Sequence, residues 1–194
     1  MQHVDARESG VVEWRSTVAP ADCDRIRDIT VSTGMFSAEE TEIAVELAEE
    51  NLAKGDGSGY SFLFAVVHGR LVGFTCYGLI PGSEKRYEIY WIAVEKNYQG
   101  QGVGTMLMKK TEEAILVRGG VRAYIETSSR SEYKPTQAFY IANGYVAVAE
   151  LADYFRDGDG KIIFMKNLRG SKPQNLPSVG MGGDGTKAAV AVPG

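Results

Sequence analysis

One stretch of sequence decides the fold: residues 90–105 read YWIAVEKNYQGQGVGT. Its apolar first part, up to Val94, is typical of a buried strand, and the chain then enters a turn that holds Gly100, Gly102 and Gly104. Apolar residues recur at helical spacing beyond the turn, so we expect strand, turn and helix in that order. Glycines let the turn curl tightly and leave its backbone N–H groups accessible. Unpaired N–H groups at a helix N-terminus, together with the helix dipole, favour an anion such as a pyrophosphate.

Two well-known phosphate-binding turns do not fit this stretch. A P-loop needs a lysine after its last glycine, but Thr105 follows Gly104 here. A dinucleotide-binding turn needs a third glycine three residues after the second, and Thr105 or Leu107 occupies that position. The pattern that remains is Gln/Arg-x-x-Gly-x-Gly/Ala, which Gln99, Gly102 and Gly104 satisfy.

Hydrophobic patterning along the rest of the chain predicts a mixed α/β layer of the α+β type and not a doubly wound sheet. The expected strands lie at residues 11–17, 61–67, 71–79, 87–94, 123–127, 145–151 and 161–167. The expected helices lie at 21–33, 38–54, 103–117 and 135–142. Ser37 and Glu40 form a capping-box pair before the second helix, and the last two strands should form a hairpin around 157–160. The apolar face of the third helix is expected to hold Val103, Met106, Leu107, Ala114 and Val117.

Composition and charge restrict the class of protein. The chain has 194 residues, 44% of them apolar, which predicts one domain with a core that needs no disulfide or metal. A net charge of −4 argues against binding nucleic acid through broad neutralisation of phosphates. No apolar run approaches a membrane span and no signal-peptide pattern opens the sequence. With only Cys23 and Cys76 as cysteines, we expect a cytoplasmic protein with no disulfide, nucleic-acid or membrane partner.

Composition also divides the chain into an N-terminal extension at 1–10, a folded domain at 11–168 and a C-terminal tail at 169–194. The tail holds six glycines and three prolines and has no aromatic residue, which is typical of a flexible segment. The sequence leaves open whether the protein forms a homodimer.

The glycine turn, together with the run AFYIANGY at 138–145, makes residues 11–168 resemble the GNAT superfamily of N-acetyltransferases. The resemblance implies a mixed, mostly antiparallel sheet flanked by helices. Its central strands, 87–94 and 123–127, should run parallel and splay apart.

The resemblance further implies that acetyl-CoA is the co-substrate, with its pyrophosphate on the turn and its pantetheine arm along the preceding strand. Residues implied in donor binding are Ile92, Ala93, Val94, Gln99, Gly100, Gln101, Gly102, Val103, Gly104 and Thr105. Tyr133 is added to this group, although the family often has an asparagine there.

Two residues would carry the implied chemistry. Tyr140 stands where the family commonly has a tyrosine that protonates the departing thiolate, a step open to a phenol at neutral pH. The alternative is that Tyr140 is a core aromatic. Glu88 stands where the family often has a general base that deprotonates the acceptor's ammonium. Glu126 as the base, or Glu88 as a solvated strand-end charge, are the alternatives. Alternation along the strand places Glu88, Tyr90 and Ile92 on one face and Tyr87, Ile89 and Trp91 on the other.

The acceptor is expected to contact Tyr90, Glu126 and Arg130, and Arg130 can hold a carboxylate. An acidic, aromatic background suits the primary amine of a small molecule or amino acid, which would attack the thioester directly in a ternary complex. A peptide N-terminus or lysine is the alternative acceptor. A non-catalytic acyl-CoA-binding module also stays open, although the joint presence of Glu88 and Tyr140 speaks against it. Two histidines and two cysteines with no ligand spacing predict no metal site.

Overall fold

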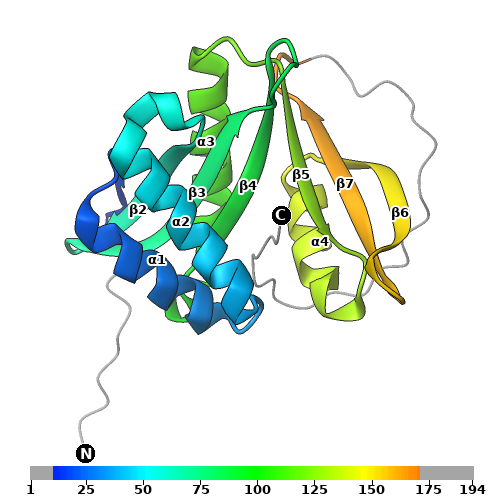
Figure 1. The fold of residues 1–194 in the computed structure, drawn as a ribbon, viewed down its shortest axis with the longest axis horizontal. Helices are drawn as coiled ribbons and strands as arrows, with labels where there is room; N and C mark the ends of the chain where they lie inside the picture. The colour runs from blue at the N-terminus through cyan, green and yellow to red at the C-terminus, as the bar shows by residue number, and fades with distance from the viewer. Residues whose placement is uncertain (1–10, 171–194) are drawn as a thin grey trace, which may run out of the picture.

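The computed structural model describes residues 11–170 (Figure 1). The predicted extension at 1–10, and the predicted tail beyond residue 170, lie outside the described residues, so the domain boundaries stay predictions. The helices are α1 (Pro20–Thr33), α2 (Ala38–Lys54), α3 (Val103–Val117) and α4 (Lys134–Ala142). The strands are β1 (Glu13–Arg15), β2 (Ser61–Val67), β3 (Arg70–Leu79), β4 (Arg86–Val94), β5 (Arg122–Ser128), β6 (Val146–Arg156) and β7 (Asp159–Asn167). Short 3₁₀ turns occupy Gly55–Ser58 (η1), Lys96–Tyr98 (η2) and Ser131–Tyr133 (η3).

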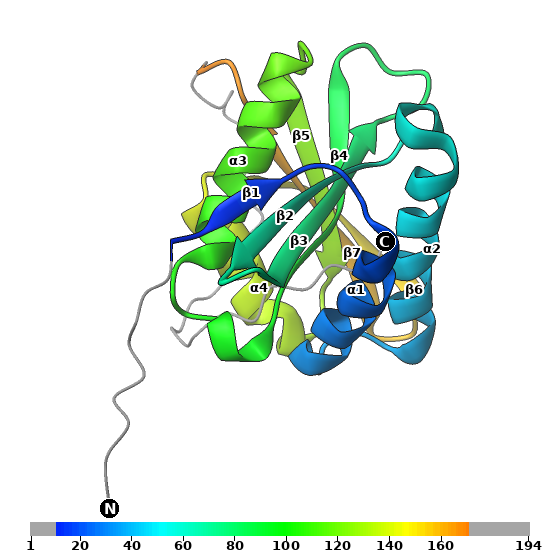
Figure 2. The ribbon, with the colours of Figure 1, turned by 90° about the vertical axis from the view of Figure 1, so that its left-hand side faces the viewer.

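All seven strands lie in one sheet with the order β1-β2-β3-β4-β5-β7-β6. Neighbouring strands are antiparallel except β4 and β5, which run parallel. Helices α1 and α2 cover one face of the sheet and α3 and α4 cover the other, which gives three layers (Figure 2). The prediction of a mixed, mostly antiparallel sheet flanked by helices is therefore confirmed. No helix in the described part of the chain combines the length and apolar character that a bilayer crossing requires.

Each face of the sheet has its own apolar core. The core under α3 and α4 includes Ile89, Leu107, Ile115, Tyr140 and Phe164. The core under α1 and α2 includes Ile26, Ile29, Phe62, Phe74 and Trp91. Full burial of one such side chain stabilises the fold by about 1.5–3 kcal/mol. Because β4 contributes to both cores, it is held from both faces and forms a rigid base for the residues along it.

Two local sequence signals produce the expected structure. The Ser37 hydroxyl accepts a hydrogen bond from the Glu40 amide (3.1 Å), and the Glu40 carboxylate accepts one from the Ser37 amide (2.6 Å), so the predicted capping box begins α2. The β2–β3 hairpin turns at His68 and Gly69, whose φ angles are 50° and 73°. Positive φ at both central residues is what a tight two-residue hairpin turn requires.

The β6–β7 hairpin is longer than the sequence predicts. Its turn is only Asp157 and Gly158, and Asp159 and Gly160 already belong to β7. Gly160 is needed for close packing and not for a turn, since a Cβ there would lie 2.7 Å from the Leu151 carbonyl oxygen. The prediction of a four-residue turn at 157–160 is wrong for this reason.

The buried face of α3 also differs from the prediction. Val117 is 88% exposed and Met106 is 38% exposed, while the polar residues Thr111 and Glu112 are buried. Thr111 exchanges a 2.7 Å hydrogen bond with Thr75 on β3, which satisfies its hydroxyl. Glu112 accepts hydrogen bonds from Lys166 of β7, and the two carboxylate oxygens lie 2.8 and 2.7 Å from the ammonium. Polar groups with such partners can be buried without the usual desolvation cost.

Candidate active site

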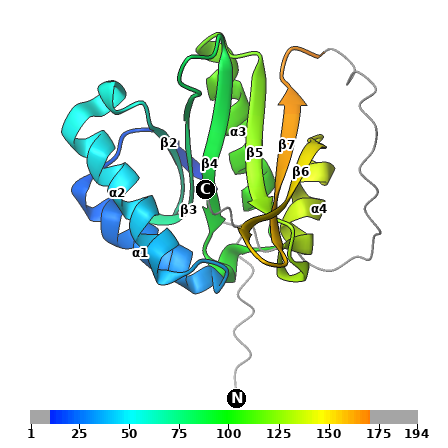
Figure 3. The same ribbon diagram turned by 45° about the vertical axis from the view of Figure 1, so that its right-hand side comes forward.

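The site begins where β4 and β5 part. These strands pair only over Arg86–Glu88 and Arg122–Tyr124, and beyond these residues they diverge (Figures 1 and 3). The predicted splay of a parallel central pair is confirmed. Glu88 is the last residue of β4 that pairs with β5, so it lies at the point where the two strands begin to separate. We call this place, where β4 and β5 separate, the fork.

A β-bulge lies directly after the fork. On β3, Cys76 pairs with Trp91 and Tyr77 pairs with Ile89, which leaves Tyr90 without a partner residue. A bulge of one residue reverses the alternation of every side chain that follows it. Ile92 therefore joins Ile89 in the core under α3 and α4, while Trp91 belongs to the opposite core. Tyr90 lies on the face opposite Tyr87 and Ile89, as predicted, and the predicted alternation of faces is wrong from Trp91 onward.

Tyr90 itself packs edge-on against Tyr60, with ring centroids 5.5 Å apart. Burial, with the Glu88 charge as a smaller cause, raises the pKa of Tyr90 to about 12. Its hydroxyl is therefore a neutral hydrogen-bond donor near the fork throughout the physiological pH range.

Two carboxylates and one ammonium face each other at the fork. Glu88 is half-buried, and burial, followed by the negative charge of Glu126, raises its pKa above 4.5 although Lys161 opposes the shift. The Glu88 side chain makes no hydrogen bond or ion pair with any residue at 11–170. Glu126 does have a partner, because it forms an ion pair with Lys161 of β7. The sequence prediction thus brings Glu88 and Glu126 together correctly, but it misses Lys161.

Lys161 has an environment that its position in the sequence does not suggest. Its ammonium lies 3.9 Å from the centroid of the Tyr154 ring, and its side chain is only 10% exposed. Burial alone would lower the pKa of Lys161, but hydrogen bonds and charges of Glu126 and Tyr154 raise it overall. The sequence did carry a signal for this residue: a lysine at an inward-facing position of one hairpin strand, with Tyr154 and Phe155 on the other strand of the same hairpin.

Tyr140 lies in the core under α3 and α4. Its side chain is fully buried, with its ring 5.5 Å from that of Phe164 and 6.3 Å from that of Tyr145. Its hydroxyl has no hydrogen-bond partner among residues 11–170. Burial, with a smaller effect of Tyr133, raises the pKa of Tyr140 well above 10, so its hydroxyl stays protonated at neutral pH. An unpaired buried hydroxyl costs about 1–3 kcal/mol, which a bound acceptor group would recover.

The glycine turn ends β4 and begins α3 as predicted. Gly100 and Gly102 have φ angles of 74° and 85°, a conformation that favours glycine. Two glutamines shape the turn from within: the Gln99 side chain donates to the Val94 carbonyl (2.9 Å), and the Gln101 side chain donates to the Asn97 carbonyl (2.7 Å).

Nothing in the turn blocks the start of the helix. Gly102 is the N-cap of α3 and brings no side-chain cap, and a Cβ on Gly100 or Gly102 would meet no atom of residues 11–170 within 4 Å. The first turn of α3, with Val103, Gly104 and Thr105, therefore has backbone N–H groups that no N-cap side chain satisfies.

Strand β4 offers backbone groups beside this turn. Ile92, Ala93 and Val94 pair with β3 on one side only, and within residues 11–170 no strand pairs with them on the side of β5. Their side chains are buried, and apart from the Val94 carbonyl, which accepts from Gln99, their backbone edge toward β5 has no strand partner among residues 11–170, which is the geometry that an added extended chain requires.

An ion-pair cluster fixes the end of β4. Glu95 is buried and contacts Arg25 of α1 (3.1 Å) and Arg70 of the β2–β3 hairpin (2.6 Å). Arg25 also donates to the Leu71 carbonyl (2.7 Å). The glycine turn therefore starts from a point that is attached to both α1 and the hairpin.

Arg130 and Tyr133 lie together on the β5 side of the fork, in the segment between β5 and α4. The Arg130 guanidinium lies 5.3 Å from the centroid of the Tyr133 ring, and the Tyr133 hydroxyl donates to the Met35 carbonyl (3.1 Å). Because Met35 lies between α1 and α2, this hydrogen bond connects the two sides of the fork. Donor binding by Tyr133 stays a prediction, with its hydroxyl already engaged by Met35.

Comparison with known proteins places this geometry in a family. Residues 24–145 match the model of the acetyltransferase (GNAT) family. A solved structure from Desulfovibrio desulfuricans, described as an acetyltransferase of the GNAT family, is 37% identical and has a TM-score of 0.80 over 81% of this chain and 99% of that one. A solved aminoglycoside 6′-N-acetyltransferase complexed with coenzyme A is 19% identical and has a TM-score of 0.65 over 84% of this chain and 99% of that one.

A curated relative from Methanocaldococcus jannaschii carries the name of an uncharacterized N-acetyltransferase. It is 29% identical over 111 residues, which make up 57% of this chain and 69% of the relative. The glycine turn, the fork and these matches lead to one conclusion: the chain is an N-acetyltransferase that belongs to the acetyltransferase (GNAT) family.

Proposed function

We propose that the protein transfers the acetyl group of acetyl-CoA directly to the primary amine of a small molecule or amino acid. The observation that carries this proposal is the position of Glu88, a half-buried carboxylate without a partner at the vertex of the fork. An ammonium must lose a proton before its nitrogen can attack a thioester, and a carboxylate with a raised pKa is a better base for that step.

The residues of the turn fit the donor. Open space around Gly100 and Gly102, at an uncapped helix start, is where a pyrophosphate can approach the backbone closely. The unpaired backbone edge of Ile92, Ala93 and Val94 fits an extended pantetheine arm. In this proposal Gln99 and Gln101 act by shaping the turn.

Glu88 is proposed as the base in preference to Glu126. Both carboxylates lie at the fork, but Glu126 is already engaged in an ion pair with Lys161. Glu88 has no such partner and its pKa is raised. Lys161 and Glu126 together set the charge next to Glu88 and are proposed as positioning residues.

Tyr140 is proposed as the general acid. Its hydroxyl is protonated at neutral pH and has no hydrogen-bond partner in the described part of the chain, so it can donate to a departing thiolate without first breaking a hydrogen bond to a described residue. Solvent would return the proton after the coenzyme leaves. The cytoplasmic location we propose agrees with Cys23 and Cys76, which are both free thiols.

The proposal is tested by measuring thiol release from acetyl-CoA against a panel of small amines, amino acids and short peptides. Turnover with small amines, lowered in Glu88→Gln much more than in Glu126→Gln, is the expected result. Turnover with peptides alone would replace the small-molecule acceptor by a protein or peptide acceptor. Tight binding of acetyl-CoA with no turnover on any amine would indicate a binding module and refute the proposal.

A further inference from the structure

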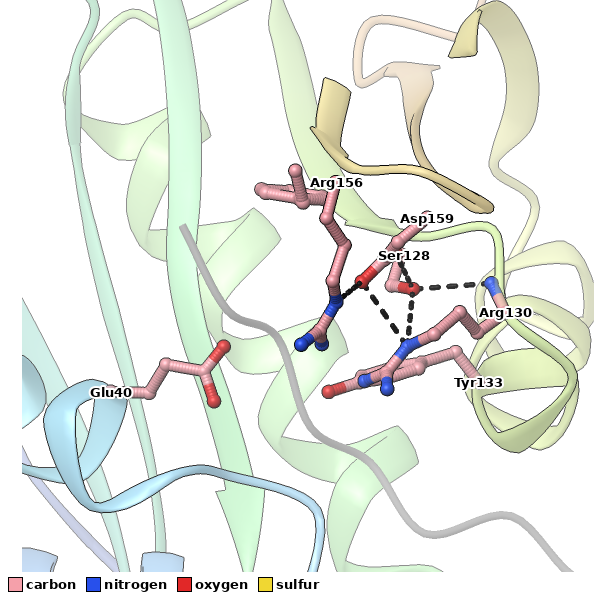
Figure 4. A pocket seen from close by; sticks show the side chains of 7 residues that line it. Glu40, Ser128, Arg130, Tyr133, Arg156 and Asp159 are labelled. Atoms are coloured by element: carbon pink, nitrogen blue, oxygen red, sulfur yellow. Dashed lines mark hydrogen bonds and ion pairs between the residues drawn. The ribbon is translucent and has the colours of Figure 1, made fainter. Parts of the chain in front are cut away.

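A small pocket lies between the N-terminal end of α2, the C-terminal end of β5 and the N-terminal end of β7. Its volume is about 80 Å³. Figure 4 shows its charged members: Glu40 faces the pocket from α2, and Arg130 and Arg156 face it from the opposite wall. The lining residues are Glu40, Ser128, Arg130, Tyr133, Phe155, Arg156 and Asp159. The pocket therefore has one wall on each side of the fork.

The buried carboxylate of Asp159 contacts the Nε atom of both arginines. Asp159 is 3% exposed, and one of its oxygens lies 3.2 Å from Nε of Arg130 and 3.2 Å from Nε of Arg156. Its other oxygen accepts a hydrogen bond from the Ser128 hydroxyl (2.5 Å). Ser128 also accepts from the Arg130 amide (3.1 Å), which fixes the start of the loop that carries Arg130.

This arrangement leaves the terminal nitrogens of both guanidinium groups without an ion pair. Asp159 contacts only Nε of each arginine, and no carboxylate of a described residue forms an ion pair with their Nη atoms. The Arg130 side chain also interacts with the Tyr133 hydroxyl. Arg130 is further held against the Tyr133 ring. Guanidinium groups bind carboxylates through pairs of parallel N–H donors, so two fixed groups with exposed Nη atoms are ready to receive one.

The charges of the pocket limit the anion to a single carboxylate. Two arginines face one buried aspartate, which leaves an excess positive charge on this wall. Glu40 supplies a negative charge from the other wall, with one of its oxygens engaged by the Ser37 amide. A ligand with two negative charges would be repelled by Glu40, whereas a monocarboxylate with a cationic or donor group beside it matches both walls.

We propose that this pocket binds the carboxylate of the acceptor, which makes the acceptor an amino acid and not a simple amine. The inference rests on the proposed function. Asp159 and Lys161 are two residues apart on β7, as are Ser128 and Glu126 on β5. Two residues of a strand span about 6.6 Å, so the pocket lies one such step from the Glu126–Lys161 pair at the fork. Glu88 pairs with Tyr124, a further two residues back along β5, so the pocket lies about 13 Å along the strand from the proposed base. An amino acid whose reacting amine is several bonds away from its carboxylate can therefore reach both the pocket and Glu88.

The test compares acceptors that differ only in the carboxylate: each amino acid, its carboxamide and its decarboxylated amine. Thiol release from acetyl-CoA gives kcat/KM for each. The wild-type protein should prefer the amino acid tenfold or more, chiefly through a lower KM. In Arg156→Gln this preference should fall toward 1. Arg156→Lys keeps the positive charge but loses the pair of parallel N–H donors, so its preference should lie between those of the wild type and Arg156→Gln. Arg27→Gln is the matched control, because Arg27 forms its ion pair with Glu42 away from the pocket, and it should keep the wild-type preference.

Two results would overturn the inference: a wild-type protein with no preference for the carboxylate, or an Arg156→Gln variant that keeps the preference. If no amine turns over at all, the proposed function fails, and calorimetry of amino acids in the presence of coenzyme A still decides the role of the pocket. Heat of binding with the wild type that is lost in Arg156→Gln supports the pocket, while no heat with either protein rejects it. Thermal melting of each variant excludes loss of folding, which is not expected because the Arg156 side chain is 66% exposed.

Discussion

Replacement of Gly102 tests the donor site most directly. Gly102 has a φ of 85°, and a Cβ there meets no atom of a described residue within 4 Å. Gly102→Ala therefore causes no clash, and its cost is the left-handed conformation alone, roughly 1–2 kcal/mol. For a domain of this size such a cost lowers the melting temperature by about 2–8 °C. The protein should stay folded at room temperature.

Binding of acetyl-CoA should suffer much more. The new methyl group would stand at the N-terminus of α3, where the pyrophosphate is proposed to accept hydrogen bonds from the backbone. A hydrogen bond to a charged group contributes about 1.5–3 kcal/mol, so the loss of one such bond lowers the affinity by about 10- to 150-fold. Gly102→Glu adds a negative charge at the same place and should abolish measurable binding.

Gly119 provides the matched control. It has a φ of 82° and equally open surroundings, but it follows the other end of α3. Gly119→Ala should cost the same stability and leave the affinity for acetyl-CoA unchanged. Calorimetry with acetyl-CoA and thermal melting on both variants separate the two effects. Equal affinities of the two alanine variants, or a folded Gly102→Glu protein with wild-type affinity, would refute the proposed donor site.

Three further predictions concern the fork and the core behind it. Glu88→Gln should lower turnover most at pH values below the pKa of the acceptor amine. The measurement is a pH profile of kcat/KM, with Glu126→Gln for comparison. An unchanged profile would show that Glu88 is not the base. Because burial raises the pKa of folded Glu88 above 4.5, the folded state binds the proton more tightly and the wild type loses stability as the pH rises through that interval. Thermal melts should therefore find Glu88→Gln more stable than the wild type at pH 7 and equal to it below about pH 4; a lower melting temperature at pH 7 would contradict this. Tyr140→Phe should lower turnover by about one to three powers of ten without loss of stability. Tyr145→Phe, which removes another buried hydroxyl from the same core, should keep turnover. Equal effects of the two variants in kinetics would make Tyr140 a core aromatic only.

Local signals predicted most of the frame of this site. The capping box of α2, the glycine turn and the strand that ends in it all depend on short runs of sequence, and all are present in the structure. Glu88 could be placed at the fork because the turn fixes its distance along the strand. The bulge at Tyr90 could not be predicted, because an extra residue in a strand needs no glycine and leaves the composition of the strand unchanged.

Contacts between distant segments account for the rest. Asp159 and Gly160 have the composition of a turn, and only the close approach of β6 explains why they extend β7 instead. Lys161 and the pocket around Asp159 were missed with them. In the same way, Thr111 is buried because a partner 36 residues away satisfies it. A periodic apolar pattern cannot contain such information.

The short pairing of β4 and β5 has a consequence for how the molecule opens. Sheets usually fray from their outer strands, but here the middle of the sheet has only three residue pairs between its two parts. Amide hydrogens along the later part of β4 should therefore exchange with deuterium faster than their deep location suggests. A donor bound along that edge would supply the missing strand pairing and slow this exchange. A bound co-substrate would then act as an additional strand in the middle of the sheet.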